Sequence, residues 1–439
     1  MVSFLYALGM AALVAYGGHL LWLAWGYVDE QGERGGSVPS HDELPDEPDD
    51  WPRVLVQIPV YNERYVVERV VDACAQLDYP SDRLTVQVLD DSTDDTTEIA
   101  RERVARWRKR GVSIELLHRE HREGFKAGAL QHGLERSESD LVAVFDADFR
   151  PEPDFLRRTV PEFTDPEVGM VQGRWGHLNE EVSVLTRVQA MSLDAHFAVE
   201  QYVRNRRGHF MNFNGTAGIW RRSCIREAGG WEGDTLTEDL DLSYRAQMAG
   251  WTFRYLPDLE VPAELPVDMR GLRQQQFRWA KGAIQTAGKL LGPLWRSDEA
   301  TSTKWAGSFH LLAHATFPFV VLVALLHAPL LVLEAAGAGP GPVYFAAMGF
   351  GLWAFLGVVL VQLLAQRELH PDWLGRSGRI VWFLAGTMGL AVNNARAVLE
   401  AAAGRASPFT RTPKFRITDA DASSRWWKAL YAGTGSTSP

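Results

Sequence analysis

The sequence has few cysteines and no excess of positive charge. Cys74 and Cys224 are its two cysteines among 439 residues, and they lie far apart without metal-ligand spacing. That absence argues against a cysteine metal site, and two buried, reduced thiols are expected, as in a cytosolic domain. The net charge is −10, and acids interrupt or flank the arginine clusters at 101–110 and 204–207. No nucleic-acid partner is therefore expected.

Two nucleotide-binding signatures are also missing. No Gly-x-Gly-x-x-Gly follows the first apolar strand, which argues against a dinucleotide oxidoreductase, and no Gly-Lys-Ser/Thr loop suggests a P-loop enzyme. The middle of the chain instead alternates apolar strands with helical stretches, which predicts βαβ units and an α/β fold with a mostly parallel sheet. The predicted strands are 54–59, 84–89, 113–117 and 141–145, and the predicted helices are 94–110 and those starting near residues 63 and 124.

The N-terminal segment is apolar. Residues 2–27 carry no charge, and Trp22, Trp25 and Tyr27 stand at the exit end. The run is long enough to span a bilayer, and aromatic side chains suit the interface, so residues 1–28 are predicted to form a transmembrane anchor. A cleaved signal peptide is the alternative, but it would require a basic segment before the apolar run. Residues 29–50 read as an acidic linker.

The C-terminal part is apolar again. Two transmembrane helices are predicted within 305–367, at 309–333 and 343–364. The connection between them lacks Lys and Arg, whereas the next one is basic and is expected to face the cytoplasm. A third apolar stretch, within 379–404, carries Arg396 near its centre. Because an arginine at mid-bilayer is costly, this stretch is expected to lie along the interface or to pack inside protein.

The most informative motif is a pair of aspartates. Asp146 and Asp148 end the apolar run 141–145. A strand in this position delivers both carboxylates to the sheet edge where α/β folds bind ligands, and Mg²⁺ or Mn²⁺ favours such oxygen ligands. An exposed acidic turn is the alternative for the pair taken alone.

Other motifs precede and follow this pair in a fixed order. They are Ile58-Pro59-Val60-Tyr61-Asn62-Glu63, Val88-Leu89-Asp90-Asp91-Ser92-Thr93-Asp94, Gly124-Phe125-Lys126-Ala127-Gly128, Thr237-Glu238-Asp239-Leu240-Asp241 and Gln275-Gln276-Phe277-Arg278-Trp279. The ordered set, followed by apolar helices, resembles the processive, membrane-embedded glycosyltransferases of family 2. These are the cellulose synthases and the cellulose-synthase-like mannan and glucan synthases, and the resemblance covers about residues 53–416.

The resemblance implies a GT-A-type catalytic domain at 51–262, followed by an interfacial region at 263–304. Asp239 would be the base that removes the proton of the acceptor hydroxyl, so that a single displacement inverts the anomeric centre. Asp146 and Asp148 would hold Mg²⁺ or Mn²⁺. Donor-binding roles are implied for Asp90, Asp91, Lys126, Gln275 and Arg278, and acceptor-binding roles for Thr237, Glu238 and Trp279.

A later segment, 405–417, supports a polymer product. Phe409-Thr410-Arg411-Thr412-Pro413-Lys414 resembles the gating loop of cellulose synthases, Phe-x-Val-Thr-x-Lys, with Arg411 in place of the valine. Thr412 and Lys414 would then contact the donor. Such a loop must face the cytosol, which two membrane crossings after the catalytic domain allow. Residues 418–439 form a polar tail.

Three functions stay open. The first is an inverting, processive β-glycosyltransferase that uses UDP-glucose or GDP-mannose to extend a glucan or mannan. The second adds one sugar to a membrane lipid, and the third is a catalytically inactive transporter or scaffold. The expected partners are a nucleotide-sugar, a polysaccharide or glycolipid acceptor, the lipid bilayer and a second copy of the chain in a homo-oligomer. The expected location is the cell membrane, with several spans and a cytoplasmic catalytic domain.

Overall fold

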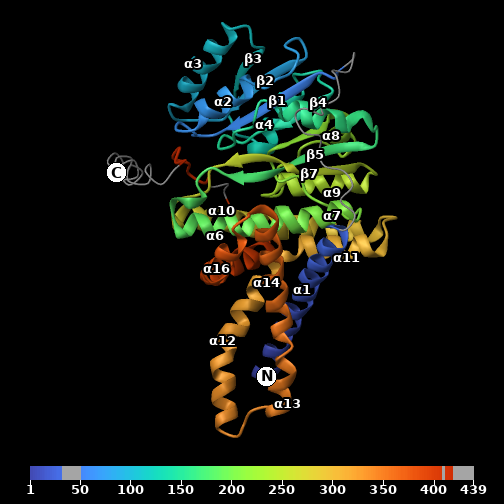
Figure 1. Cartoon of the computed structure of the whole chain (residues 1–439), viewed down its shortest axis with the longest axis vertical. Helices are drawn as coiled ribbons and strands as arrows, with labels where there is room; N and C mark the ends of the chain where they lie inside the picture. The colour runs from blue at the N-terminus through green and yellow to red at the C-terminus, as the bar shows by residue number, and fades with distance from the viewer. Residues whose placement is uncertain (32–50, 408–410, 419–439) are drawn as a thin grey trace. The chain divides into compact units, whose positions relative to one another are not determined.

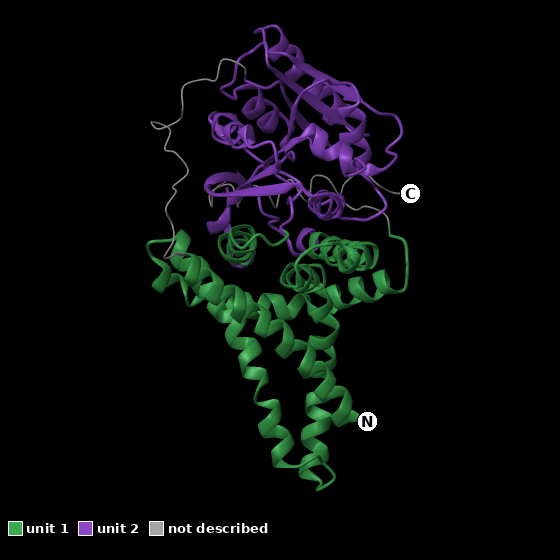
Figure 2. Cartoon of the chain, turned by 90° about the vertical axis from the view of Figure 1, so that its right-hand side faces the viewer, with its two compact units in different colours: residues 1–34, 191–210, 273–410 green, residues 35–190, 211–272, 411–439 purple. Residues whose placement is uncertain are grey.

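The computed structural model describes residues 1–31, 51–407 and 411–418. The chain folds into two compact units, coloured separately in Figure 2. The helical unit comprises Met1–Arg34, Met191–Phe210 and Arg273–Thr410, and the sheet unit comprises Gly35–Ala190, Met211–Leu272 and Arg411–Pro439. Most of the predicted linker 29–50, Phe409 and Thr410 of the predicted gating loop, and nearly all of the predicted tail 418–439 lie outside the described residues.

The sheet unit is built on one seven-stranded sheet in the order β3-β2-β1-β4-β6-β5-β7. β6 runs antiparallel to both of its neighbours, β4 and β5, while the other neighbouring strands pair in parallel. The prediction of an α/β fold with a mostly parallel sheet is therefore confirmed. The strands are β1 Val54–Val60, β2 Leu84–Asp90, β3 Ile114–His118, β4 Leu141–Val144, β5 Val168–His177, β6 Gly218–Arg221 and β7 Thr252–Ala263.

The central strands are buried on both faces. Every residue of β4 is buried, and β1 and β2 each contain one residue that is not. Such continuous apolar runs are typical of parallel strands covered by helices on both sides. At the end of β4 the Phe145 ring contacts Phe155 edge to face, with 4.9 Å between the centroids. The same hydrophobic core joins the β1, β2 and β4 side chains to those of β5, β6 and β7.

The helices of the sheet unit match the predicted alternation, with one shift in position. The helix predicted from Glu63 begins at Val67, because residues 63–66 form a turn in which the Val66 and Val67 N–H groups both donate to the Glu63 carbonyl at 3.0 Å. The α-helices of this unit are α2 Val67–Ala75, α3 Thr96–Arg108, α4 Phe125–Leu134, α5 Phe155–Thr159, α8 Arg222–Glu227 and α9 Glu238–Met248, and its 3₁₀ helices are η2 Val160–Thr164 and η3 Glu180–Val182. Boundaries between the units fall within α6 Val184–Ala195 and α10 Met269–Arg296.

Among its described residues, the helical unit contains three helical segments that are long and apolar enough to cross a membrane: Val2–Glu30, Ala313–Ala335 and Pro342–Leu369. Within this unit α1 packs against α12 and α14 (Figure 1). Within 379–404, the stretch predicted to lie along the interface or to pack inside protein, Arg379–Ala402 forms α16, which does not meet these criteria among the described residues. The elements are α1 Val2–Gln31, η4 His196–Gln201, α7 Tyr202–Arg206, α11 Thr301–Leu311, η5 Ala313–Ala315, α12 Thr316–Ala335, α13 Pro342–Met348, α14 Gly351–Leu369, α15 Trp373–Arg376 and α16.

Buried charge in the helical unit is paired. Lys281, which is fully buried, lies 3.2 Å from the Glu400 carboxylate, and Glu400 in turn accepts a hydrogen bond from Arg396 at 2.8 Å. Arg204, also buried, donates to Glu200 at 2.9 Å. An unpaired ion in a low-dielectric interior is costly. Pairing offsets this cost, but it adds little net stability to the folded protein.

Candidate active site

The carboxyl ends of three neighbouring strands bring the sequence motifs to one edge of the sheet. In the parallel register, Val60 of β1 stands beside Asp90 of β2, and Gln57 stands beside Val144 of β4. The segments that follow these strands therefore leave the sheet at the same edge. This edge is where open α/β sheets bind their ligands.

A lysine contacts each carboxylate of the aspartate pair. Lys126, in the first turn of α4, donates to Asp146 Oδ1 at 2.5 Å, and Lys414 donates to Asp148 Oδ2 at 2.5 Å. Lys414 also donates to the main-chain carbonyl of Glu264. The two aspartates are part-buried, with 35% of the Asp146 side chain and 16% of the Asp148 side chain exposed. This set of hard oxygen donors fits Mg²⁺ or Mn²⁺.

Asp239 belongs to the same cluster. A side chain at Gly215 would place its Cβ 2.9 Å from Asp239 Oδ2 and 3.4 Å from Lys126 Nζ, so both groups lie against this glycine. Lys126 also donates to the Gly215 carbonyl at 2.8 Å. The backbone of Gly215 has φ of +81°, which glycine adopts without strain. The sheet unit therefore brings Asp146, Asp239 and Lys126 around one stretch of main chain.

Burial and neighbouring charges shift the ionisation of this cluster. The pKa of Asp239 is raised to about 7, chiefly by burial and then by the charge of Glu238, while the charge of Lys126 opposes this rise. For Lys126, burial alone would lower the pKa, but the charges of Asp146, Glu238 and Asp239 outweigh burial and raise it. A carboxylate whose pKa lies near neutrality is suited to general-base catalysis, and a lysine that stays charged is suited to phosphate binding.

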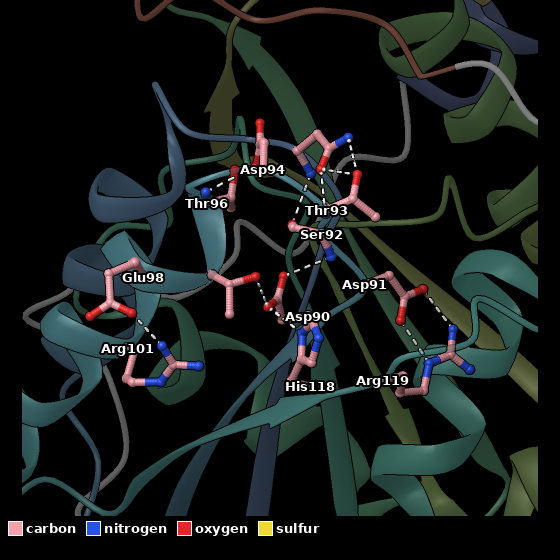
Figure 3. A network of polar contacts seen from close by, with 12 residues as sticks. Asp90, Asp91, Ser92, Thr93, Asp94, Thr96, Glu98, Arg101, His118 and Arg119 are labelled. Atoms are coloured by element: carbon pink, nitrogen blue, oxygen red, sulfur yellow. Dashed lines mark hydrogen bonds and ion pairs between the residues drawn. The ribbon is translucent and has the colours of Figure 1, made fainter.

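The two aspartates at the end of β2 have different surroundings (Figure 3). Asp90 is fully buried and accepts hydrogen bonds from Ser92 N at 3.0 Å, Thr97 Oγ1 at 2.7 Å and His118 Nδ1 at 2.8 Å. Its carboxylate thus holds the loop after β2 to β3 and α3. Asp94 accepts a hydrogen bond at 2.9 Å from the N–H of Thr96, the first residue of α3.

Asp91 is held by an arginine that the motif analysis missed. Arg119 Nε donates to Asp91 Oδ1 at 2.7 Å and Arg119 Nη2 donates to Oδ2 at 2.6 Å, a bidentate pair. Arg119 also donates to the Phe125 carbonyl at 3.0 Å, which ties the end of β2 to the start of α4. Arg119 directly follows β3 and so lies at the same sheet edge, and this position in the sequence could have indicated its role.

The segment 411–418 docks onto the same edge. Arg411 lies 3.1 Å from Glu63 Oε1, and Phe415 N donates to Glu264 Oε1 at 2.8 Å. Burial raises the pKa of Glu63 to about 8, although the Arg411 charge lowers it. Glu264, itself buried, accepts a hydrogen bond from Arg69 at 3.2 Å. Thr412 is buried, and its methyl group would lie 3.6 Å from a Cβ on Gly271.

Fewer contacts are described for the other predicted site residues. Gln275, Arg278 and Trp279 lie on the part of α10 that belongs to the helical unit, so their roles stay predictions. Glu238 begins α9, and Thr237 stands at its N-cap position without a side-chain capping hydrogen bond. The residues described include a further acidic group, Glu232, Asp234 and Asp241, each with one carboxylate oxygen within 4.8 Å of the other two. Arg245 pairs with Asp241 at 2.7 Å.

Comparison with known proteins finds a matching family and similar proteins. The family model described as glycosyltransferase like family 2 matches residues 52–282. Glucomannan 4-beta-mannosyltransferase 7 of Arabidopsis thaliana is 46% identical over 259 residues, covering 58% of this chain and 47% of the relative. Glucomannan 4-beta-mannosyltransferase 1 of Oryza sativa subsp. japonica is 44% identical over 286 residues, covering 62% and 55%.

A solved structure has the same fold. A mannosyltransferase from Pyrobaculum calidifontis, in complex with GDP-Man and Mn²⁺, aligns with a TM-score of 0.56 at 20% identity, covering 91% of this chain and 99% of that one. The chain belongs to the glycosyltransferase-like family 2, as the motif series predicted. It spans about half the length of the two plant relatives.

Proposed function

We propose that the protein is an inverting β-hexosyltransferase that extends a β-linked mannan or glucan from a nucleotide-sugar at a membrane. The observation that carries the proposal is the cluster of Asp146, Asp148, Lys126 and Asp239 at one sheet edge. Its composition matches the needs of the reaction, because a diphosphate leaving group requires positive charge and an attacking hydroxyl requires a base. The names of the plant relatives and of the structural neighbour make GDP-mannose the first donor to test, and UDP-glucose the second.

The carboxylates of Asp146 and Asp148 would hold Mg²⁺ or Mn²⁺, which supplies positive charge to the departing diphosphate. Lys126 and Lys414 each contact one of these carboxylates, so their ammonium groups would be available to bind phosphate oxygens near the cation. From the motif resemblance, Arg278 and Gln275 would bind the donor, with the planar guanidinium of Arg278 suited to a diphosphate. Thr412 stands two residues before Lys414 in the docked segment. Asp91, fixed by Arg119, would face the nucleoside, while Asp90 shapes its loop from within.

Asp239 would accept the proton of the acceptor hydroxyl. Leu240 N donates to Asp239 Oδ1 at 2.8 Å, and Oδ2 is the oxygen that lies against Gly215, so Oδ2 is the atom assigned to receive the proton. Because the acceptor attacks once, opposite to the departing diphosphate, an α-linked donor yields a β-linked product. Thr237, Glu238 and the aromatic face of Trp279 would bind the acceptor sugar.

The three long apolar helices point to a bilayer as the setting. We place the sheet unit on the cytoplasmic side of a cell membrane, where nucleotide-sugars are made, with the growing polysaccharide as acceptor. α16 would lie at the interface, since an exposed Arg396 and the exposed apolar side chains Val381, Trp382 and Val392 share one amphipathic helix.

The test is donor turnover by the full chain reconstituted in liposomes. GDP-mannose and UDP-glucose are supplied separately with Mn²⁺, Mg²⁺ or a chelator, and both nucleoside diphosphate release and product size are measured. We expect release that needs a divalent cation and an insoluble, β-linked polymer. Turnover unaffected by the chelator would remove the role given to Asp146 and Asp148. A single labelled glycolipid in place of a polymer would favour transfer to a membrane lipid.

The aspartate pair can be tested directly with a matched control. Asp148→Asn removes the charge of a proposed cation ligand, and Asp78→Asn removes that of an exposed aspartate which pairs with Arg157 at 2.7 Å on the surface. Only the first variant is expected to lose cation-dependent release.

A further inference from the structure

A buried glutamine in β5 controls the stretch of main chain around which the site is built. Gln172 has no exposed surface, although its side chain is polar. Its amide nitrogen lies 2.8 Å from the Gly173 carbonyl, 3.0 Å from the Thr216 carbonyl and 3.0 Å from the Ala217 carbonyl. Its amide oxygen accepts a hydrogen bond from Asn214 N at 3.1 Å. One side chain therefore grips both ends of the segment 214–217.

This segment has an uncommon backbone. Gly215 has φ of +81° and Ala217, which carries a Cβ, has φ of +57°. A left-handed conformation at a non-glycine residue is costly and persists only where surrounding contacts hold it in place. The contacts that do so are those of Gln172 and two main-chain hydrogen bonds, from Ala217 N to the Val144 carbonyl and from Gly173 N to the Ala217 carbonyl, both 2.9 Å.

The held segment touches three members of the site. Thr216 Oγ1 accepts a hydrogen bond from Asp146 N at 2.9 Å. The Gly215 carbonyl accepts one from Lys126 at 2.8 Å, and Asp239 Oδ2 lies against the same glycine. The position of the segment thus sets the spacing between a proposed cation ligand, a proposed phosphate-binding lysine and the proposed base.

We propose that Gln172 is a positioning residue for glycosyl transfer, which acts by locking segment 214–217 in the strained form that places Asp146, Lys126 and Asp239 relative to one another. The inference rests on the proposed function. Gln172 is fully buried, and the hydrogen bonds described for its side chain all join it to main-chain atoms. Its removal is therefore expected to disturb the geometry of the reacting groups more than the affinity for the donor.

The chain offers a matched control. Gln57 is likewise a fully buried glutamine in a strand of the same sheet, and its amide donates to the Leu130 carbonyl at 3.1 Å. The side-chain hydrogen bonds described for Gln57 do not involve segment 214–217. Gln57→Met and Gln172→Met remove the same polar groups from the same kind of environment. They differ in the main-chain segment that loses its hydrogen bonds to the glutamine side chain.

The experiment compares donor turnover by the two variants and the wild-type chain in liposomes, per amount of folded protein. We expect Gln172→Met to lower kcat about 10- to 100-fold, since small displacements of reacting groups cost this much, with donor KM changed less than about threefold. Gln57→Met is expected to keep kcat within about twofold. Thr216→Val, which removes the acceptor for Asp146 N, is expected to lower kcat in the same way and gives a second readout if Gln172→Met does not fold.

Equal kcat values for Gln172→Met and Gln57→Met, or a loss confined to KM, would overturn the inference and leave the proposed function standing. A wild-type chain that turns over no nucleotide-sugar would overturn both. A loss of kcat shared by Gln172→Met and Thr216→Val, with Gln57→Met active, supports the inference.

Discussion

Both units pair their buried charges, but the sheet unit also crowds several carboxylates together. In the helical unit, Lys281 meets Glu400 and Arg204 meets Glu200, pairs that leave the interior neutral. In the sheet unit, Asp146, Asp148, Asp239 and Glu63 gather at one edge, and burial raises the pKa of Asp239 to about 7 and that of Glu63 to about 8. Paired charge of the first kind supports a structure, whereas a crowded set of carboxylates is costly to fold and useful for chemistry.

The comparison predicts that charge changes in the carboxylate cluster at the sheet edge alter turnover, and that those in the buried pairs of the helical unit alter stability. The largest effect is expected for Asp239→Asn, which removes the proposed base while keeping its shape. Transfer is expected to fall about 10²- to 10⁴-fold, the usual contribution of general-base catalysis. Nucleoside diphosphate release by reconstituted protein measures it. Donor binding by the variant serves as the control, and near-normal turnover would contradict the assignment of the base.

The next effect is on stability in the helical unit. Glu400→Gln leaves the ammonium of the fully buried Lys281 without its carboxylate, and breaking a buried ion pair in this way costs about 3 kcal/mol. Arg396 is the other partner of Glu400, and its own side chain is 75% exposed. Arg396→Gln is therefore expected to cost less than about 1 kcal/mol of stability. Thermal unfolding followed by fluorescence measures both. Equal losses for the two variants would mean that burial does not decide the cost.

The pH dependence couples activity to stability in the sheet unit. With the pKa of Asp239 at about 7, transfer is expected to rise about tenfold per pH unit below that value and then to level off. The folded state binds this proton more tightly than the unfolded state, whose aspartate titrates near pH 4. The contribution of Asp239 to the free energy of unfolding therefore falls as pH rises between these two values.

Asp239→Asn removes that titration, so the melting temperature of the variant is expected to depend less on pH across this window than that of the wild type. Melting curves at several pH values measure the difference. Parallel profiles for variant and wild type would show that Asp239 ionises normally.

The smallest effect is expected at the surface of the sheet unit. Arg101 pairs with Glu98 one helical turn earlier, and both side chains are more than half exposed. Arg101→Ala is expected to change the free energy of unfolding by less than about 0.5 kcal/mol and to leave turnover unchanged. A clear loss of activity would contradict the comparison, because it would mean that charges away from the sheet edge also matter for turnover.

Much of the fold could be predicted from local patterns. The apolar runs that became β1, β2, β3 and β4 and the helices between them follow from periodicity and strand length, which depend on near neighbours in the chain. β5, β6 and β7 were not predicted individually, and the reversal of β6 is set by its pairing with strands on both sides. Likewise, the sequence around residues 309–333 indicates one apolar helix, but the structure inserts the 3₁₀ turn Ala313–Ala315 before α12.

The sequence by itself determined which chemical groups the protein carries and in what order: the carboxylates of Asp146, Asp148 and Asp239, and the apolar helices. These depend on residue type and spacing alone. Only the tertiary structure decided that Arg119 holds Asp91, that Lys414 reaches Asp148 from 266 residues away, and that Gln172 grips segment 214–217. The reason is physical, since the partner of a side chain is chosen by packing between distant segments, and local sequence carries no record of that choice.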